Sequence, residues 1–386
     1  KLVYAKSQAF YAGLEKSVGA PSPKLRSAMH AEHCDAADSK DEFTTTNYDL
    51  TTMPVIEWYY VVDYEAGLKE LKIPFYPKET RGIGGSHKRG PRQLRDLEGA
   101  LAEKNALLRL VGQAELLLDE MIAGRLYTGP MFQKYNQVLR AAIKEALPFM
   151  KEDFERSCKG NRYTTTIHAL NSVVVKCSKL TKVAPVYRGM AKGVLPKTFW
   201  TENSEGVRGG VEPGFMSTTT SREVALSYAQ GGAGATPMLF EMRQGMVDRG
   251  ADISWLSQYP HEEEILFAPL TCIEMRGSHT EQGVIILDMS LSINLMAPTI
   301  EKVIAKLKTS QEDLIRLLTE DFKVHHVDAE QALAPLEQQL KAVRARDGAW
   351  FNEAQNFEST IADVFVARHK VLQWMIENGL PAPCPR

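Results

Sequence analysis

The feature that most constrains the fold is a change of sequence period in the middle of the chain. Residues 94–122 carry leucine, alanine and glutamate at helical spacing, and further helices are expected up to residue 180. Residues 185–294 instead form short β-rich runs separated by glycine and proline. After residue 298, apolar positions return to spacings of three and four, which predicts one apolar stripe per helix. Helices followed by a block of short strands predict an α+β fold and argue against a wound βαβ sheet.

The block before the strands predicts three helices. The first covers residues 94–122, the second begins after Pro130, and the third covers residues 164–180. Proline suits the start of a helix, because the first turn needs no donor from its backbone nitrogen.

The β-rich block predicts six short strands, at residues 186–188, 214–218, 238–242, 264–268, 272–275 and 284–293. In this block no G-x-G-x-x-G sequence follows a strand. A dinucleotide would therefore not be bound through a Rossmann fold.

The two ends of the chain carry no chemistry that the sequence reveals. In residues 1–95, an aromatic and β-branched run at residues 53–62 predicts a strand, and a stretch rich in glycine and arginine at residues 81–95 predicts an exposed loop. Helices after residue 298 predict a hairpin or bundle that packs on the preceding domain or on another chain. We therefore expect an accessory region at 1–95, an α+β domain at 96–296 and a helical region at 297–386.

Composition narrows the class of protein. The 386 residues allow two or three domains, and 44% hydrophobic with 24% charged residues is typical of a soluble globular chain. A net charge of −2 argues against a nucleic-acid or membrane partner that is recruited by bulk charge. We find no apolar run of about 18 residues, and no basic and apolar leader.

The cysteines point in the same direction. Their number is odd, they are scattered, and they lack metal-ligand spacing, which predicts reduced thiols and no metal site. We therefore expect a cytoplasmic or otherwise intracellular protein.

Three consecutive acidic residues, Glu262-Glu263-Glu264, precede the apolar run at residues 265–267. In an extended segment, Glu262 and Glu264 would share one face and Glu263 would lie on the other. Two carboxylates with separate roles are a recurring acid–base device, although a triplet of this kind is by itself more typical of a solvated strand end.

Two motifs upstream change that interpretation. Arg188-Gly189 ends one expected strand, and Ser217-Thr218-Thr219 lies in another some thirty residues later. Their order and spacing, followed by E-x-E before an apolar strand, closely resemble the arginine–serine–glutamate class of mono-ADP-ribosyltransferases. Residues 126–129 and 135–140 also look like the helical lead-in of that family. The resemblance covers about residues 110–294.

The resemblance implies a fold and an activity. The fold would be a helical N-terminal lobe with two packed, mostly antiparallel β-sheets, extended here by an N-terminal segment and C-terminal helices. The activity would be transfer of ADP-ribose from NAD, the co-substrate, to arginine side chains of a protein, with release of nicotinamide and without a metal. An NAD glycohydrolase and a non-enzymatic binding domain are the alternatives.

The resemblance also implies roles for single residues. Glu264 matches the catalytic glutamate that holds the ribose 2′-hydroxyl, and Glu262 matches the acid that positions and deprotonates the acceptor. Ser217 matches the serine that orders the site, within the NAD-binding strand that also carries Thr218 and Thr219.

Chemistry supports a role in NAD binding for the Arg188-Gly189 motif. The planar guanidinium of Arg188 suits a pyrophosphate, which it can bind through two parallel hydrogen bonds. Gly189 would let backbone groups approach the nicotinamide amide.

The segment before the acidic triplet corresponds to the target-recognition turn of that family. Tyr259 is the candidate for contact with the acceptor, and Trp255 is the second candidate. The glycine-rich stretch at residues 231–235 lies where the family has a mobile loop.

Overall fold

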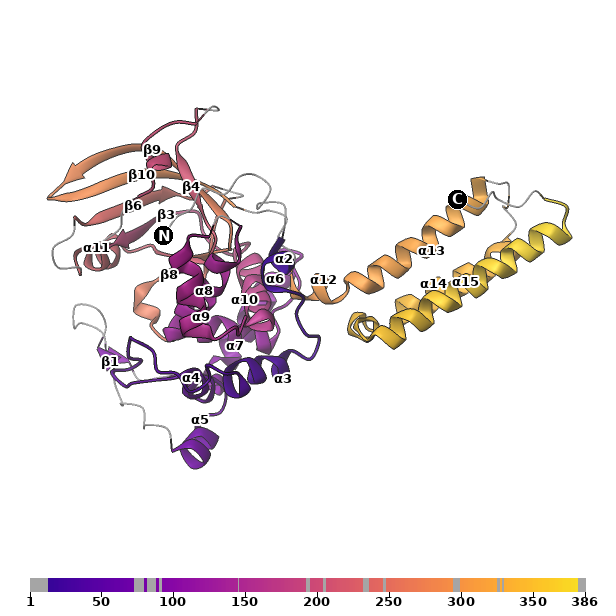
Figure 1. The fold of residues 1–386 in the computed structure, drawn as a ribbon, viewed down its shortest axis with the longest axis horizontal. Helices are drawn as coiled ribbons and strands as arrows, with labels where there is room; N and C mark the ends of the chain where they lie inside the picture. The colour runs from indigo at the N-terminus through magenta and orange to yellow at the C-terminus, as the bar shows by residue number, and fades with distance from the viewer. Residues whose placement is uncertain are drawn as a thin grey trace. The chain divides into compact units, whose positions relative to one another are not determined.

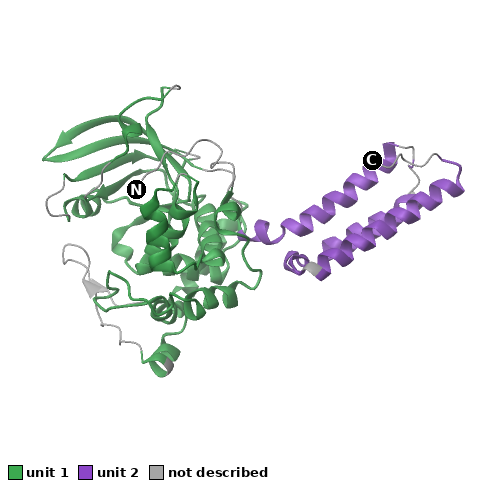
Figure 2. Cartoon of the chain, in the orientation of Figure 1, with its two compact units in different colours: residues 1–299 green, residues 300–386 purple. Residues whose placement is uncertain are grey.

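The structure is a computed structural model. It describes residues 13–72, 80–81, 88–89, 92–144, 146–191, 195–203, 206–231, 236–245, 248–293, 299–324, 327 and 330–380. Two compact units are present, residues 1–299 and residues 300–386, and each is described by itself (Figure 2). The expected division at residues 95 and 296 stays a prediction.

The described N-terminal residues are mainly helical. Their α-helices are α2 (Gly13–Val18), α3 (Leu25–His30), α4 (Pro54–Val62) and α5 (Tyr64–Ala66), with π-helical turns at Ala31–Asp35 and Gly67–Leu71. Strands β1 (Thr80–Arg81) and β2 (Lys88–Arg89) pair in an antiparallel ladder. Residues 82–87 and 90–91 of the expected exposed loop lie outside the described part of the chain.

The strand predicted at residues 53–62 is wrong, because this segment forms helix α4. Pro54 occupies the first turn, where its missing N–H costs no hydrogen bond. An apolar run of this length is compatible with a strand or with a buried helix. Tertiary packing favours the helix, because the helix buries Trp58, Tyr60 and the carboxylate of Glu57.

Five helices form the lobe that precedes the strands: α6 (Glu98–Leu110), α7 (Leu118–Leu126), α8 (Phe132–Ala142), α9 (Pro148–Cys158) and α10 (Thr164–Cys177). The helices expected after Pro130 and at residues 164–180 are therefore present. The run expected at 94–122 is not one helix, since residues 111–117 interrupt it and Gly112 has a φ of +68°. Helix α9 was not predicted.

One eight-stranded sheet contains all six predicted strands, in the order β4-β9-β10-β6-β3-β5-β8-β7 (Figure 1). The strands are β3 (Pro185–Met190), β4 (Gly209–Glu212), β5 (Met216–Thr219), β6 (Met238–Arg243), β7 (Ala251–Asp252), β8 (Glu264–Phe267), β9 (Thr271–Glu281) and β10 (Val284–Ser292). Neighbouring strands are antiparallel except β10 and β6. The α+β prediction is confirmed.

The two expected sheets correspond to two halves of this eight-stranded sheet, β4-β9-β10-β6-β3 and β5-β8-β7. One residue pair, Tyr187 and Thr219, joins β3 to β5. Buried side chains from both halves share one core, among them Val186, Phe240, Met216 and Phe267. The halves therefore pack on each other through side chains, and β3 and β5 end side by side at the junction.

The second unit is helical, as predicted. It contains α12 (Ile300–Ile304), α13 (Lys306–Val324), α14 (Glu330–Ala345), a 3-10 helix at Gly348–Asn352, and α15 (Ala354–Glu377). Its buried side chains, including Ile315, Leu336, Phe351 and Val364, form a core of their own. Among the helices that the structure describes, none has both the length and the apolar character that a membrane span requires.

Candidate active site

A cavity of about 570 Å³ opens where strands β3, β5 and β8 meet the turn between α7 and α8. This volume is in the range of cavities that hold small-molecule ligands. All eight predicted site residues line it: Arg188, Gly189, Ser217, Thr218, Thr219, Tyr259, Glu262 and Glu264. The structure therefore brings together motifs that are up to 76 positions apart, from Arg188 to Glu264.

Arg188 is positioned by the neighbouring strand. Its Nη1 donates a hydrogen bond of 2.6 Å to the backbone oxygen of Ser217. Within the described part of the chain, this oxygen is its only hydrogen-bond acceptor. Burial lowers the pKa of Arg188, but a guanidinium stays charged at physiological pH. The remaining N–H groups can therefore bind an anionic ligand in the cavity.

Helix α8 supports this site from behind. Arg140 binds both carboxylate oxygens of Glu212, at 3.0 and 3.2 Å, and the charge of Arg140 lowers the pKa of that buried carboxylate. The side-chain oxygen of Asn136 accepts a hydrogen bond of 2.8 Å from the backbone nitrogen of Phe215. These contacts fix the turn before β5, which explains the presence of the polar residues in the helical lead-in.

Glu264 is the first residue of β8 and is only 6% exposed. Burial raises the pKa of its carboxyl to about 8, and the negative charge of Glu262 acts in the same direction. A hydrogen bond from Ser217 and the charge of Arg188 oppose this shift. A cationic group in the cavity would favour the ionised carboxylate, because opposite charges lower the pKa of an acid.

The two threonines of β5 have hydroxyls that are already bonded within the fold. Thr218 donates to the backbone oxygen of Ile265 at 2.7 Å, and the Thr219 hydroxyl accepts from the backbone nitrogen of Ser221 at 3.0 Å. Thr219 thereby supports the start of helix α11 (Arg222–Gln230). Both threonines line the cavity, and their contact with NAD stays a prediction.

The acidic triplet is not extended, so the predicted alternation of faces along a strand is wrong. Glu262 and Glu264 still face the same cavity, for a different reason. Pro260–Glu262 forms a single 3-10 turn, and Glu263 has a left-handed backbone with a φ of +46°. This turn places Glu262 and Glu264 on the same cavity. Glu263 is exposed and accepts a hydrogen bond of 2.6 Å from the hydroxyl of Thr220.

Glu262 has a partner that the sequence did not suggest. The hydroxyl of Tyr228, on α11, donates to Glu262 Oε1 at 2.6 Å. Burial raises the pKa of Glu262, which makes its carboxylate a stronger base, and the hydrogen bond from Tyr228 opposes the shift. Two carboxylates with different surroundings thus lie in one cavity, a pattern suited to separate catalytic tasks.

Comparison with known proteins agrees with this geometry. The family model described as NAD:arginine ADP-ribosyltransferase matches residues 99–293, which is half of the chain. The chain belongs to this family. It is therefore an ADP-ribosyltransferase with NAD as its co-substrate. No curated protein sequence matches the chain significantly.

Several solved structures are similar to part of this transferase. ADP-ribosyltransferase HopU1 of Pseudomonas syringae pv. Tomato is 20% identical over 52% of this chain and 87% of its own, with a TM-score of 0.38. Exoenzyme S of Pseudomonas aeruginosa, bound to carba-NAD, is 22% identical over 51% and 84%, with a TM-score of 0.33. The Vis transferase of Vibrio splendidus, solved with agmatine, is 19% identical over 54% and 89%, with a TM-score of 0.36.

Gly189 has a role in the transferase fold that sequence reasoning did not predict. A Cβ at this position would lie 1.8 Å from the backbone oxygen of Ala225 in α11. Glycine is therefore required for the packing of β3 against α11, which lie beside each other (Figure 1). Close approach of this backbone to nicotinamide stays a prediction.

Other parts of the cavity were also missed. Tyr228 lies on α11, a helix that was not predicted. Ser221 could have indicated the start of this helix, because the Ser221 hydroxyl caps it by accepting from the backbone nitrogen of Val224. Thr45 and Thr46 come from the N-terminal region, whose sequence carries no readable motif. Trp255, the second aromatic candidate, does not line the cavity. Residues 232–235 of the glycine-rich stretch lie outside the described residues.

Proposed function

We propose that this ADP-ribosyltransferase modifies arginine side chains of a protein acceptor. The observation that supports arginine is the carboxylate of Glu262, which lies in the cavity with Glu264 and has a raised pKa. A guanidinium is protonated at neutral pH and is a poor nucleophile in that form. An adjacent carboxylate can bind the cation and accept a proton as the guanidinium nitrogen attacks.

On the sugar side, Arg188 binds the pyrophosphate of NAD, and Glu264 in its ionised form holds the ribose 2′-hydroxyl. Positive charge grows on the sugar as the bond to nicotinamide breaks, and the Glu264 carboxylate stabilises that charge. Ser217 positions this carboxylate through its hydrogen bond.

On the acceptor side, the arginine nitrogen forms the new bond to the ribose carbon that nicotinamide leaves. The bonding electrons of the broken bond go to nicotinamide. The proton that the arginine nitrogen loses goes to Glu262, so that charge and atoms balance. Tyr259, at the cavity edge, contacts the acceptor.

Labelled NAD tests this proposal on the purified protein. We expect label on arginines of a protein mixture, identified by mass spectrometry. The Glu262→Ala variant should lose this label and still release free ADP-ribose, whereas Glu263→Ala should keep it, because Glu263 is exposed and bonded to Thr220.

Two results would contradict the proposal. Arginine labelling that survives in Glu262→Ala would remove the assignment of this residue. Free ADP-ribose as the only product of the unaltered protein would instead identify an NAD glycohydrolase.

A further inference from the structure

The turn that carries Tyr259 rests on a segment more than two hundred residues earlier in the chain. The Tyr259 hydroxyl donates to Asn47 Oδ1 at 2.5 Å and accepts from the backbone nitrogen of Tyr48 at 3.1 Å. The rings of Tyr48 and Tyr259 stack with centroids 5.5 Å apart. Asn47 also donates to the side-chain oxygen of Gln258 at 3.0 Å. The position of Tyr259 is thus set by residues of the N-terminal region.

This segment is itself held in a defined shape. The backbone nitrogen of Phe43 bonds to the oxygen of Thr52, and Asn47 and Leu50 exchange two backbone hydrogen bonds. Inside this turn, Tyr48 and Asp49 have left-handed backbones, which few residues adopt without support. Asn47 Nδ2 supplies support by donating to the buried carboxylate of Glu57 at 2.7 Å.

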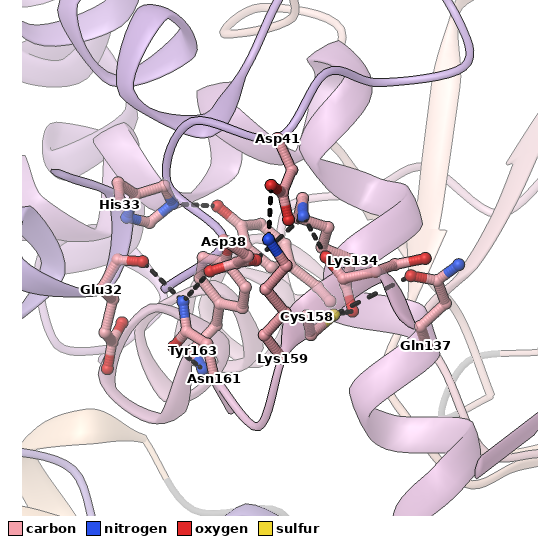
Figure 3. A network of polar contacts seen from close by, with 12 residues as sticks. Glu32, His33, Asp38, Asp41, Lys134, Gln137, Cys158, Lys159, Asn161 and Tyr163 are labelled. Atoms are coloured by element: carbon pink, nitrogen blue, oxygen red, sulfur yellow. Dashed lines mark hydrogen bonds and ion pairs between the residues drawn. The ribbon is translucent and has the colours of Figure 1, made fainter. Parts of the chain in front are cut away.

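A polar network joins the preceding residues to the helical lobe (Figure 3). The buried carboxylate of Asp38 accepts from Lys134 at 2.9 Å, from Tyr163 at 2.7 Å and from Asn161 at 2.9 Å. Asp41 accepts from Lys159 at 2.7 Å. The chain that enters the turn at Phe43 is therefore fixed to the same lobe as the cavity wall.

Two residues of the turn, Thr45 and Thr46, line the cavity directly. The lining of this cavity includes Arg188 and Ser217 as well as Tyr259 and Glu262. The contact of the next residue, Asn47, with Tyr259 places the turn beside Tyr259. The Thr45 hydroxyl accepts a hydrogen bond of 2.7 Å from Gln133 of α8. The hydroxyl of Thr46 is exposed and has no hydrogen-bond partner among the described residues. Thr46 thus has a hydroxyl that is available to a ligand in the cavity.

Gln258, the residue before Tyr259, is closely packed on the side that faces away from Asn47. A Cβ on Gly129 would lie 2.5 Å from the side-chain nitrogen of Gln258, which donates to the backbone oxygen of Arg125 at 2.9 Å. Gln258 is therefore clamped between Asn47 on one side and the end of α7 on the other. This packing leaves little freedom for the recognition turn to shift without the N-terminal segment.

We propose that Thr45–Thr46 and Asn47–Tyr48 form a second acceptor-recognition element, with Thr46 beside the acceptor's guanidinium group and Asn47 positioning Tyr259. The proposal rests on the proposed arginine-directed activity. It assigns acceptor selection to the N-terminal region. The proposed NAD-binding residues Arg188, Ser217 and Glu264 instead lie on β3, β5 and β8.

Charge substitutions at Thr46 test the element with agmatine, a small guanidinium compound, as acceptor. Thr46→Lys should raise the KM for agmatine roughly fivefold, and Thr46→Glu should lower it by a similar factor, as expected for one charge near a cationic ligand at a partly solvated site. The KM for NAD, measured as nicotinamide release without agmatine, should change by less than about twofold, because screening weakens the effect with distance.

Thr44 provides a matched control. It is the same residue type, is exposed and does not line the cavity. Thr44→Lys and Thr44→Glu should leave both KM values unchanged. A Thr46 pair that behaves as the Thr44 pair does would overturn the proposal.

Asn47 is tested directly. Asn47→Ala removes the oxygen that accepts from Tyr259 and the amide that donates to Gln258, and should raise the KM for agmatine by a larger factor than it lowers nicotinamide release without agmatine. Equal losses in both reactions would indicate a general structural role and overturn the positioning role. A wild-type protein that releases nicotinamide but modifies neither agmatine nor arginines of a protein mixture would instead contradict the arginine-directed activity itself. If only protein arginines are modified, the same variants are compared with a labelled protein acceptor.

Discussion

The two sides of the cavity are built differently. On the sugar side, Arg188, Ser217 and Glu264 come from three neighbouring strands and are fixed by the sheet. On the acceptor side, Glu262 and Tyr259 come from a short turn, and that turn rests on the N-terminal segment. Sites on strands are held more exactly than sites on loops, and loops vary more readily. Under the proposed function, the side that binds NAD is therefore held by the sheet, and we expect the side that selects the acceptor to vary without disturbing it.

The largest effect should come from the sugar side. Glu264→Gln keeps the size of the side chain and removes the negative charge that we propose stabilises the sugar. We expect kcat/KM for NAD to fall on the order of 10²–10³-fold in both hydrolysis and transfer. Nicotinamide release with and without agmatine measures the two reactions. A Glu264→Gln variant that loses transfer but keeps NAD hydrolysis would contradict the assignment of Glu264 to the sugar side.

Arg188→Lys should have the next largest effect. Lysine keeps the charge but cannot reproduce the two-pronged geometry of arginine. We expect the KM for NAD to rise by about tenfold to a hundredfold, as for the loss of a charge-assisted hydrogen bond. Arg140→Lys is the matched control, because Arg140 binds Glu212 and does not line the cavity. It should lower Tm and leave the KM for NAD nearly unchanged.

The pH dependence should report Glu264. Burial raises its pKa to about 8, and in the proposed mechanism only the ionised form stabilises the sugar. Below that pH, kcat/KM for NAD should therefore fall about tenfold per pH unit, and above it the profile should level off. A flat profile between pH 6 and about 8 would contradict this role.

The same carboxyl should affect stability in the opposite direction. Its folded pKa of about 8 is above the unfolded value of 4.5, so the folded state holds the proton more tightly. This contribution to the free energy of unfolding is fully present below about pH 4.5 and is lost as pH rises through about 8. Glu264→Gln should show a flatter dependence of Tm on pH than the unaltered protein.

The smallest effect should come from Glu263→Gln. Glu263 is exposed and bonded to Thr220, so both activities should stay within about twofold of the unaltered protein, as for most surface substitutions. A larger loss confined to transfer would show that the acceptor contacts extend beyond the cavity, and would sharpen the boundary between the two sides.

Local pattern predicted six of the ten described strands, the helices α8 and α10 and the helical second unit, because each depends on spacing within a few residues. It did not predict β1, β2, β4, β7 or the short helices of the N-terminal region. It was wrong for α4, since an apolar run beginning at Pro54 suits a buried helix as well as a strand. It missed α11, whose nine residues carry a weak apolar pattern. Without that helix, the partner of Glu262 and the reason for Gly189 could not be predicted.

The site was predicted in the same uneven way. The motifs at Arg188, Ser217 and Glu264 were identified from their order and from the family resemblance. The sequence placed Glu262 beside Glu264 by assuming an extended strand. In the structure, a 3-10 turn and the left-handed backbone of Glu263 bring the two carboxylates together.

The sequence by itself determined the order of the helical and β-rich blocks and the three motifs to which we assign the sugar side. Only the tertiary structure decided the acceptor side, where Asn47 meets Gln258 and Tyr259 across more than two hundred residues. The physical reason is the range of the interactions. Periodicity reports burial within one element, whereas hydrogen bonds between distant turns depend on how the whole lobe packs.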